Sequence, residues 1–482
     1  MPFDPAFSDL DIRGLTADSR QVEPGFLFAA LPGTKTDGSK FVADAVGRGA
    51  AAVLGPPGMR LDQTRPGVAL IADDNPRRRL ALMAARFYGR QPATVAAVTG
   101  TNGKTSVASF SRQIWTQLGR PAASYGTVGI EAPTIHKKLT LTTPDPVALH
   151  RDMAELADAG VEYLAIEASS HGIDQFRLDG VHLTAAAFTN LTRDHLDYHG
   201  SMAAYLKAKL RLFDVLLPPG SVAVLNADSS EWQDFANVCK ARGHRVINYG
   251  KFAKRQDLRL IGIEPKTDGM TLSLIVQERP VKCDLPLVGA FQAMNALAAL
   301  GIVLGTGGDR DAAAAALSRL QGAPGRLQRV AVHPNGAAIY VDYAHTPDAL
   351  ETVLRALRPH CSGRLVVVFG CGGDRDPGKR PMMGEVAARL ANRTIVTDDN
   401  PRSEQAAAIR KAILVASPGA YEIGDRAEAI ERAIRDLEPE DLLVIAGKGH
   451  ESGQIVGDQV LPFNDADVAR GVVRSLGGQV DG

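Results

Sequence analysis

The chain has 482 residues, which is too long for one hydrophobic core and predicts about three domains. Its 54 Lys and Arg residues balance 54 Asp and Glu residues, so the composition offers no basic field for nucleic acid. Four scattered cysteines (Cys239, Cys283, Cys361 and Cys371) lack metal spacing and disulfide density, which is typical of a reducing compartment. Without a basic-then-apolar leader or a membrane-length apolar run, we expect a cytoplasmic protein with no membrane insertion.

Residues 1–91 read as a small α/β domain. Short strands and turns come first, and the apolar runs at 51–54 and 68–71 predict two strands. A helix is predicted over 77–88, ending at Gly89, and Gln91-Pro92 reads as a linker.

Residues 92–324 read as a central domain with a parallel sheet. Predicted strands alternate there with helical stretches, which is the pattern of a parallel α/β sheet. The predicted strands lie at 93–98, 163–166, 185–188 and 222–225, and the predicted helices at 106–118, 202–216 and 293–304. Segment 254–285 instead reads as neighbouring antiparallel strands.

Residues 325–482 read as a third domain, in which βα alternation resumes. Strands are predicted at 338–342, 364–369, 393–397 and 441–446. Each run ends in glycines or charged residues, and ligands of open α/β sheets bind at the carboxyl ends of strands. We therefore predict an α/β chain of three domains, with chemistry concentrated at these strand ends.

Residues 98–105 read Val-Thr-Gly-Thr-Asn-Gly-Lys-Thr, between a predicted strand and a predicted helix. Backbone N–H groups at such a turn bind phosphate, a lysine neutralises it, and a threonine hydroxyl can bind Mg²⁺. Val98 stands where the usual pattern has glycine. The flanking strand and helix favour a site for ATP or GTP over a purely structural turn.

Two further strand ends carry candidate metal ligands. Glu167 follows strand 163–166, where an acid is the expected Mg²⁺ partner; a helix cap or ion pair is the alternative. Segment 193–200 after Asn190 is rich in Asp and His, and it could contact metal or phosphate or simply be solvated.

Lys209 lies on the apolar stripe of predicted helix 202–216, four residues after Tyr205 and three before Leu212. Burial would lower its pKa, and a neutral amine can capture CO₂ as a carbamate that binds metal. A lysine that snorkels along the apolar surface is the simpler reading of the helix pattern alone. Lys207 and Arg211 lie on another face, which we assign to solvent.

The pentapeptide Asp-Asp-Asn-Pro-Arg occurs at 73–77 and again at 398–402. Each copy follows a predicted strand, and capping of a following helix explains both. The second copy shares its domain with 372–376 and 447–451, each after a buried strand. Arg375, Arg402 and Glu451 could therefore converge on a small zwitterion, the arginines on carboxylate and the glutamate on ammonium.

Taken together, these blocks resemble the Mur ligase family of ATP-dependent amide-bond synthetases. The resemblance covers nearly the whole chain and includes the loop at 99–105, Thr142-Thr-Pro144, 167–172, 194–199, Asn295, Gly325-Arg326 and 342–347. It implies a UDP-substrate domain (1–91), a central ATP-binding domain (92–324) and a Rossmann-like domain that binds the amino acid (325–482).

The resemblance also implies roles for individual residues. The ATP-binding set is Gly100, Thr101, Asn102, Gly103, Lys104, Thr105, Ser106, Asn295, Arg326 and Asp342. The Mg²⁺ set is Thr105, Glu167, His195 and carbamylated Lys209, and the catalytic set is Lys104, His195 and Lys209. The family match thus favours carbamylation of Lys209 over snorkelling.

The remaining implied residues bind the two substrates. Ser19, Thr142, Thr143, Ser169, Gln175 and Arg177 match contacts to UDP-N-acetylmuramoyl-L-alanyl-D-glutamate. Arg375, Asp399, Asn400, Pro401, Arg402, Gly447 and Glu451 match contacts to meso-2,6-diaminopimelate. Around Thr34-Lys-Thr36 the expected uridine loop is present without a residue-for-residue match.

The implied activity is ADP-forming addition of meso-2,6-diaminopimelate to this UDP-dipeptide through an acyl phosphate, in peptidoglycan precursor synthesis. We expect ATP and Mg²⁺ as requirements and a monomer. Three alternatives stay open: the same reaction with L-lysine, a folylpolyglutamate synthetase, and a phosphate-loop regulatory ATPase that makes no amide.

Overall fold

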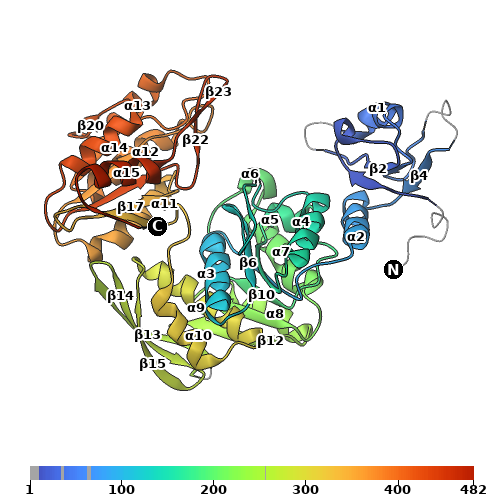
Figure 1. Cartoon of the computed structure of the whole chain (residues 1–482), viewed down its shortest axis with the longest axis horizontal. Coiled ribbons are helices and arrows are strands. Elements are labelled where there is room, and N and C mark those ends of the chain that lie inside the picture. The colour runs from blue at the N-terminus through green and yellow to red at the C-terminus, as the bar shows by residue number, and fades with distance from the viewer. Residues whose placement is uncertain (1–9, 34–36, 62–66, 140, 256, 482) are drawn as a thin grey trace. The chain divides into compact units, whose positions relative to one another are not determined.

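A computed structural model of the chain describes residues 10–33, 37–61, 67–139, 141–255 and 257–481, so the expected uridine loop at Thr34–Thr36 lies outside the described residues. Figure 1 labels the elements of the chain and colours them from the N-terminus to the C-terminus. The chain divides into two compact units. The first contains the N-terminal chain to Lys104, Trp115–Ile247 and Gly305–Gly307. The second contains Thr105–Ile114, Asn248–Leu304 and the chain from Gly308 onward.

The first unit begins with a four-stranded parallel sheet in the order β1-β2-β3-β4. Its elements are β1 (Gly14–Thr16), β2 (Phe26–Ala29), α1 (Val42–Gly47), β3 (Ala52–Gly55), β4 (Ala69–Ala72) and α2 (Pro76–Tyr88). Helix α2 ends at Gly89, whose φ of 66° is the left-handed conformation that glycine adopts most easily. The predicted strands and helix of this domain are therefore confirmed.

The same unit contains seven strands of a larger, eleven-stranded sheet, in the order β11-β10-β5-β9-β6-β7-β8. The strands from β11 to β6 are parallel, and β7 and β8 are antiparallel additions. The strands are β5 (Thr94–Thr99), β6 (Ala122–Gly126), β7 (Gly129–Glu131), β8 (His136–Lys137), β9 (Tyr163–Glu167), β10 (Ala185–Phe188) and β11 (Val222–Asn226). The helices are α4 (Pro146–Asp158), α5 (Ser170–Asp174), α6 (Leu196–His199), α7 (Met202–Arg211) and α8 (Trp232–Ala241), and helix α3 (Lys104–Gln117) has residues in both units.

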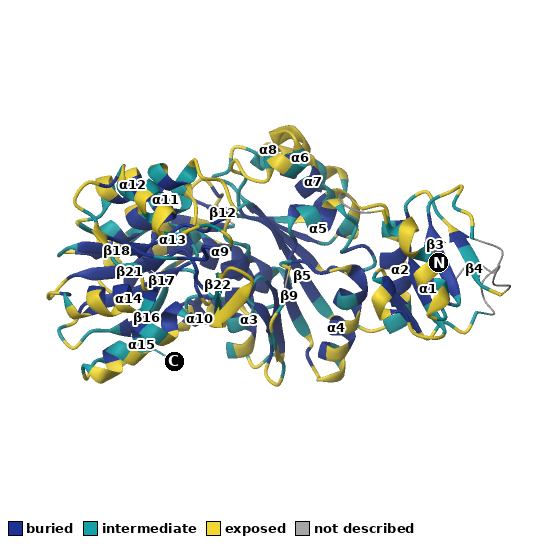
Figure 2. Ribbon diagram, turned by 90° about the horizontal axis from the view of Figure 1, so that it is seen from above, coloured by how far each residue is buried: buried dark blue, intermediate teal, exposed yellow. Residues whose placement is uncertain are grey.

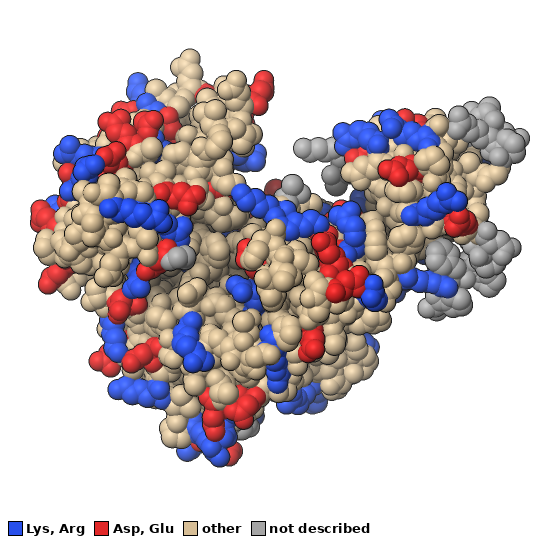
Figure 3. Space-filling view, in the orientation of Figure 1, with Lys and Arg blue, Asp and Glu red and all other residues tan. Residues whose placement is uncertain are grey.

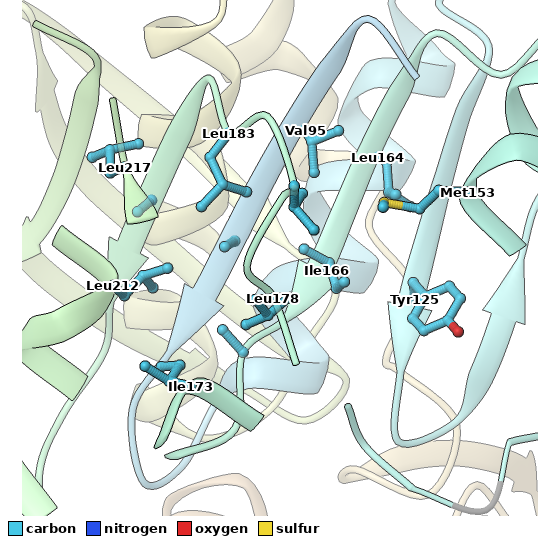
Figure 4. Close-up of a cluster of buried hydrophobic side chains, with 14 of the residues drawn as sticks. Val95, Tyr125, Met153, Leu164, Ile166, Ile173, Leu178, Leu183, Leu212 and Leu217 are labelled. Carbon is cyan, nitrogen blue, oxygen red and sulfur yellow. The ribbon is translucent and has the colours of Figure 1, made fainter. Parts of the chain in front are cut away.

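One core cluster covers a face of this sheet. Figure 4 shows Val95, Leu164 and Ile166 on the strands, with Met153 beside Leu164 and with Leu212 on the other side of the same cluster. Alternate residues of each strand point to this face, as the two-residue period of a strand requires. The predicted helix 202–216 is only partly right, because α7 ends at Arg211 and a π-helical turn, η4 (Leu212–Leu216), turns Leu212 and Phe213 into the core.

The second unit contains antiparallel strands followed by helices. Strand β12 (Arg245–Gly250) pairs with β13 through Tyr249 and Gly250. Strands β13 (Leu258–Lys266), β14 (Gly269–Val276) and β15 (Arg279–Leu285) then form two antiparallel pairs, which confirms the prediction for 254–285. Helices α9 (Ala290–Gly305) and α10 (Arg310–Ala316) follow.

The C-terminal part of this unit is a doubly wound sheet in the order β20-β19-β18-β21-β17-β16-β24. The strands are β16 (Gln328–Val332), β17 (Ala338–Asp342), β18 (Leu365–Phe369), β19 (Arg393–Val396), β20 (Tyr421–Glu422), β21 (Leu442–Ala446) and β24 (Gln479–Val480). The helices are α11 (Pro347–Leu357), α12 (Lys379–Leu390), α13 (Ala406–Leu414), α14 (Arg426–Arg435) and α15 (Asp465–Ser475). A separate hairpin is formed by β22 (Gly453–Val456) and β23 (Gln459–Pro462).

Both faces of this sheet are covered. Tyr340 packs under α11 and α12, whereas its neighbour Ile339 packs under α14 and α15. Figure 2 shows β17, β18 and β21 as buried strands between helices. Because both faces are closed, the open positions are the strand ends, as predicted.

No helix among the described residues has both the length and the apolar character needed to span a bilayer. On the face drawn in Figure 3, Lys and Arg side chains are interspersed with Asp and Glu side chains.

Candidate active site

The glycine-rich loop lies between β5 and α3, as predicted. Gly100 and Gly103 have φ of 149° and 88°. A Cβ on Gly100 would lie 1.8 Å from Thr189 Oγ1, so no other residue fits there without rearrangement. The loop therefore has the close backbone packing that phosphate-binding turns require.

Residues after β10 hold this loop in place. Thr101 N donates to Asn190 O at 2.9 Å, and Asn102 N donates to Asn190 Oδ1 at 2.9 Å. Thr189 Oγ1 donates to Asn102 O at 2.6 Å. Sequence reasoning missed this role of Thr189 and Asn190, because only tertiary pairing of β10 with β5 brings them to the loop.

Lys104 Nζ donates to Gly100 O and Thr101 O, each at 2.9 Å. The lysine thus lies over its own loop, where a bound phosphate would be. Thr105 and Ser106 are buried in the first turn of α3. The ATP-binding role of these residues stays a prediction.

Glu167 lies at the end of β9 and is 2% exposed. Its Oε1 accepts from Thr127 N at 2.7 Å, and its Oε2 accepts from Thr127 Oγ1 at 3.1 Å. Thr127 Oγ1 is also 2.9 Å from Thr142 Oγ1. The Glu167 carboxylate is therefore fixed next to predicted substrate residues. Its hydrogen bonds come from Thr127, which lies in a turn, so the helix-cap alternative is wrong.

Lys209 is 1% exposed, so the snorkelling alternative is wrong. Its Nζ lies 4.3 Å from the centre of the Tyr205 ring. Burial, and then the charge of Lys104, hold the pKa of Lys209 well below its usual range. Both effects favour the uncharged amine, which is the form that carbamate formation needs.

The assignment of Arg211 to solvent is also wrong. Its Nη2 donates to both carboxylate oxygens of Asp179, at 2.8 and 2.9 Å, and the Asp179 side chain is 4% exposed. Lys207 is exposed, as predicted.

Aromatic rings and histidines surround this part of the site. Tyr205 OH is 3.2 Å from Thr101 Oγ1, which connects the lysine's aromatic neighbour to the phosphate loop. The His195 ring lies 6.2 Å from the Tyr205 ring and 4.9 Å from the His171 ring. His195 Nε2 is 3.4 Å from Asp194 Oδ2. His195, a predicted metal ligand, therefore lies near Tyr205, the residue whose ring Lys209 contacts.

Most predicted UDP-substrate residues form one hydrogen-bonded group. Thr143 Oγ1 donates to Glu167 O at 2.9 Å and accepts from Ser169 Oγ at 3.0 Å. Arg177 Nη1 donates to Thr143 O at 2.5 Å, and its Nη2 donates to Gln175 Oε1 at 2.6 Å. Ser19 is not among them, because it lies buried in the N-terminal domain after Asp18.

In the second unit, the predicted nucleotide residues also lie together. Asp342 accepts from Leu327 N and Ala344 N, each at 2.7 Å, and burial raises its pKa. Asn295 Nδ2 donates to Gln292 Oε1, and Gln292 Nε2 donates to Arg326 O at 3.2 Å. The Arg326 guanidinium lies 4.9 Å from the centre of the Tyr343 ring.

The two copies of the pentapeptide have different structures. In the first copy Asn75 caps α2 by accepting from Arg78 N at 3.0 Å, with Pro76 in the first turn. The second copy does not start a helix, because α13 begins only at Ala406. The prediction that the second copy caps a following helix is therefore wrong, and Arg402 does not lie at a helix start.

Arg402 instead has φ of 51° and pairs with the β22–β23 hairpin. Its N donates to Ile455 O at 3.1 Å, and its O accepts from Gly457 N at 2.8 Å. Its Nη1 donates to Gly373 O at 2.8 Å. A Cβ on Gly372 would lie 2.8 Å from that nitrogen and 3.9 Å from Arg375 Cγ, so the two predicted arginines flank one glycine.

The other predicted amino-acid residues lie at the ends of β19 and β21. Asp399 Oδ1 accepts from Asn400 N at 2.7 Å, and a Cβ on Gly447 would lie 2.8 Å from Asp399 Oδ2. Asn400 Nδ2 donates to Glu451 Oε2 at 2.9 Å. Pro401 is buried beside them. Lys448, which sequence reasoning left without a role, is fully buried in the same group.

Three family models match the chain. They are the Mur ligase family catalytic domain at residues 11–88, the Mur ligase middle domain at 98–303, and the Mur ligase glutamate ligase domain at 325–449.

Similar proteins cover almost the whole chain. The UDP-N-acetylmuramoyl-L-alanyl-D-glutamate–2,6-diaminopimelate ligase of Bradyrhizobium diazoefficiens is 54% identical over 98% of this chain and 97% of its own. That of Caulobacter vibrioides is 54% identical over 96% of this chain and 95% of its own. A solved structure of a ligase with this description has a TM-score of 0.72 and 33% identity, covering 96% of this chain and 95% of its own.

The fold is shared more widely. Folylpolyglutamate synthase of Mycobacterium tuberculosis, solved with ADP and AMPPCP, has a TM-score of 0.61 at 21% identity, covering 83% of this chain and 94% of its own. At this identity the likeness describes the fold alone.

Proposed function

The chain belongs to the Mur ligase family, and we propose that it adds meso-2,6-diaminopimelate to UDP-N-acetylmuramoyl-L-alanyl-D-glutamate in an ATP-dependent, ADP-forming reaction of peptidoglycan precursor synthesis. The observation that carries this proposal is similarity to a diaminopimelate ligase along almost the whole chain, at 54% identity over 98% of its length. The phosphate loop and the strand-end residues found by sequence reasoning agree with it.

The reaction needs ATP because a carboxylate does not condense with an amine when hydroxide is the leaving group. The D-glutamyl γ-carboxylate would attack the γ-phosphorus of ATP, and the bond to the β-phosphate oxygen would break to release ADP. The diaminopimelate amine would then attack the acyl carbon, lose a proton and expel inorganic phosphate. These steps form one amide and balance one ATP against ADP and phosphate.

The chain's own groups stabilise charge on the transferred phosphoryl group. Lys104 would exchange its contacts with Gly100 O and Thr101 O for phosphate oxygens, and the loop N–H groups would donate to the same group. Asn295, Arg326 and Asp342 would bind the nucleotide, with the carboxylate of Asp342 already oriented by two backbone N–H groups.

The chemistry of the proposed ligands suits magnesium if Lys209 is carbamylated, since within the described parts of the chain no three His, Cys, Asp or Glu side chains form a metal site by themselves. Glu167 is a buried carboxylate fixed by Thr127, and a carbamate on Lys209 would add anionic oxygen, the type of ligand that Mg²⁺ prefers. Thr105 and His195 would complete the set. When bound, Mg²⁺ would neutralise negative charge that builds up between carboxylate and phosphate.

The two remaining substrates would be held by the groups described above. Thr142, Thr143, Ser169, Gln175 and Arg177 would bind the UDP-dipeptide, and Ser19 would contribute from the N-terminal domain.

Arg375 and Arg402 would pair with diaminopimelate carboxylates, and Glu451 with an ammonium group. Asp399, Asn400, Pro401 and Gly447 would shape the same site. Because L-lysine lacks the second carboxylate, the arginines favour diaminopimelate over the lysine alternative.

We further propose that the protein acts as a monomer in the cytoplasm, where ATP and the UDP-linked precursor are available, and thereby serves cell-wall growth and division. The test of the function is incubation with UDP-dipeptide, ATP and an equimolar mixture of meso-diaminopimelate, L-lysine and L-glutamate, followed by mass analysis. The expected product carries diaminopimelate. A lysine adduct would support the lysine alternative, and ATP turnover without any adduct would support the regulatory ATPase.

A further inference from the structure

Lys448 is a fully buried lysine at the carboxyl end of β21, between Gly447 and Gly449. Its Nζ donates to Asn400 Oδ1 at 2.9 Å and to Glu451 Oε2 at 3.0 Å. A buried ammonium is costly unless it is paired and hydrogen-bonded, so these two contacts are what make its position possible. None of the steps proposed above uses this residue.

The amide of Asn400 is engaged from both ends. Its Oδ1 accepts from Lys448 and also from Ile455 N at 2.9 Å, and its Nδ2 donates to Glu451 Oε2 at 2.9 Å. The Asn400 amide therefore connects the β22–β23 hairpin, Lys448 and Glu451. These contacts hold the lysine and the glutamate in place.

Glu451 consequently has two different carboxylate oxygens. Its Oε2 receives hydrogen bonds from Lys448 and Asn400, while the side chain as a whole is 32% exposed. Glu451 belongs to the same proposed site as Arg375 and Arg402, and Lys448 and Asn400 are its hydrogen-bond partners there. Arg402 Nη1 donates separately to Gly373 O.

We propose that Lys448 is a positioning residue for amino-acid selection. It holds Glu451 in place so that Glu451 Oε1 can accept a hydrogen bond from an ammonium group of the substrate. This inference rests on the proposed function, because it names how the amino-acid site of that reaction is kept open. Lys448 acts through Glu451 and does not itself touch the substrate.

The test compares Lys448→Met with Lys411→Met, which removes an exposed lysine of α13. We expect Lys448→Met to raise the KM for meso-diaminopimelate by about 30-fold or more, the usual consequence of breaking a buried charge pair. The KM values for ATP and UDP-dipeptide should stay within about twofold of wild type, since a local loss of positioning does not reach those groups. Lys411→Met should change none of the three.

A double-mutant cycle with Glu451→Gln separates positioning from general stability. If Lys448 acts through Glu451, Lys448→Met should add little to the effect of Glu451→Gln on the KM for meso-diaminopimelate. The double variant also carries no unpaired charge, so it keeps the test possible if Lys448→Met alone does not fold. Additive effects, or equal rises in all three KM values, would overturn the proposal.

These outcomes are distinguishable from failure of the proposed function. Wild-type enzyme that gave no diaminopimelate adduct would refute the function itself. Wild-type activity combined with an unchanged KM in Lys448→Met would refute only the role of Lys448.

Discussion

At the scale of single residues, Lys209 shows how burial changes chemistry. The helical stripe placed it towards the core, and the structure gives it 1% exposure beside Tyr205. Its lowered pKa follows from burial first and from Lys104 second. A buried amine of this kind has a use only if it is modified or paired, and a carbamate provides both.

Lys209→Ala should therefore reduce amide synthesis by about 100-fold or more, because an anionic group next to the transferred phosphoryl group is lost. The rate should partly return with added short carboxylic acids, which can occupy the space and supply the missing anion. The measurement is the rate of product formation with and without acetate or propionate, with circular dichroism to verify folding.

Lys207→Ala is the matched control, since Lys207 lies two residues away on the exposed face of α7. It should retain wild-type activity and show no response to added acid. Full activity in Lys209→Ala without acid would contradict carbamylation.

At the scale of elements, one pentapeptide occurs in two structures. The first copy caps α2, whereas the second lies between β19 and α13, with Arg402 in the left-handed region. The difference comes from the β22–β23 hairpin, whose backbone accepts from Arg402 N and donates to Arg402 O. Local preference for capping is worth about 1 kcal/mol, so two backbone hydrogen bonds of tertiary origin are enough to override it.

Arg402→Ala should weaken use of meso-diaminopimelate by about 2–5 kcal/mol, the cost of leaving a carboxylate of the substrate without its charge partner. The measurement is kcat/KM for meso-diaminopimelate at saturating ATP and UDP-dipeptide. Arg77→Ala changes the same residue of the first copy and should leave the ratio of kcat/KM for diaminopimelate and L-lysine unchanged. Equal effects of the two substitutions on that ratio would argue against the second copy as the amino-acid site.

At the scale of the whole molecule, three domains follow one another, and each is built on its own sheet. The strand ends of the C-terminal sheet are held by a fully buried ion pair. Arg426 Nε and Nη2 donate to Asp465 Oδ1 and Oδ2, both at 2.7 Å, and Nη2 also donates to Ala446 O at 3.0 Å. This pair ties α14 and α15 to the end of β21, directly before Gly447.

Asp465→Asn should therefore lower the free energy of unfolding of the C-terminal domain by about 3–5 kcal/mol, because it leaves the Arg426 charge buried without its partner. Thermal unfolding of the full chain, followed by hydrogen exchange in β21 and α14, is the measurement. Glu431→Gln breaks the exposed pair with Arg435 and should cost at most about 1 kcal/mol. Similar losses of unfolding free energy in both variants would show that the buried pair contributes no more to stability than the exposed pair.

The sequence by itself determined the α/β class, the central strands and helices, the phosphate loop and the strand-end position of nearly every candidate residue. These features depend on local period and turn chemistry, which short segments of sequence contain. The antiparallel segment at 254–285 was predictable for the same reason, since alternation is a local signal. Helical spacing placed Lys209 on the apolar stripe, but that pattern alone favoured a snorkelling lysine over a buried one.

Only the tertiary structure decided the rest. Thr189 and Asn190 hold the phosphate loop, Arg211 pairs with Asp179, and the second pentapeptide follows the hairpin in place of a helix. Each of these outcomes depends on a hydrogen-bond partner far away along the chain, and no local pattern specifies which partner arrives. The role of Lys448 belongs to this group, because Asn400, which contacts both Lys448 and Glu451, comes from the end of β19 and reaches them only when the sheet is formed.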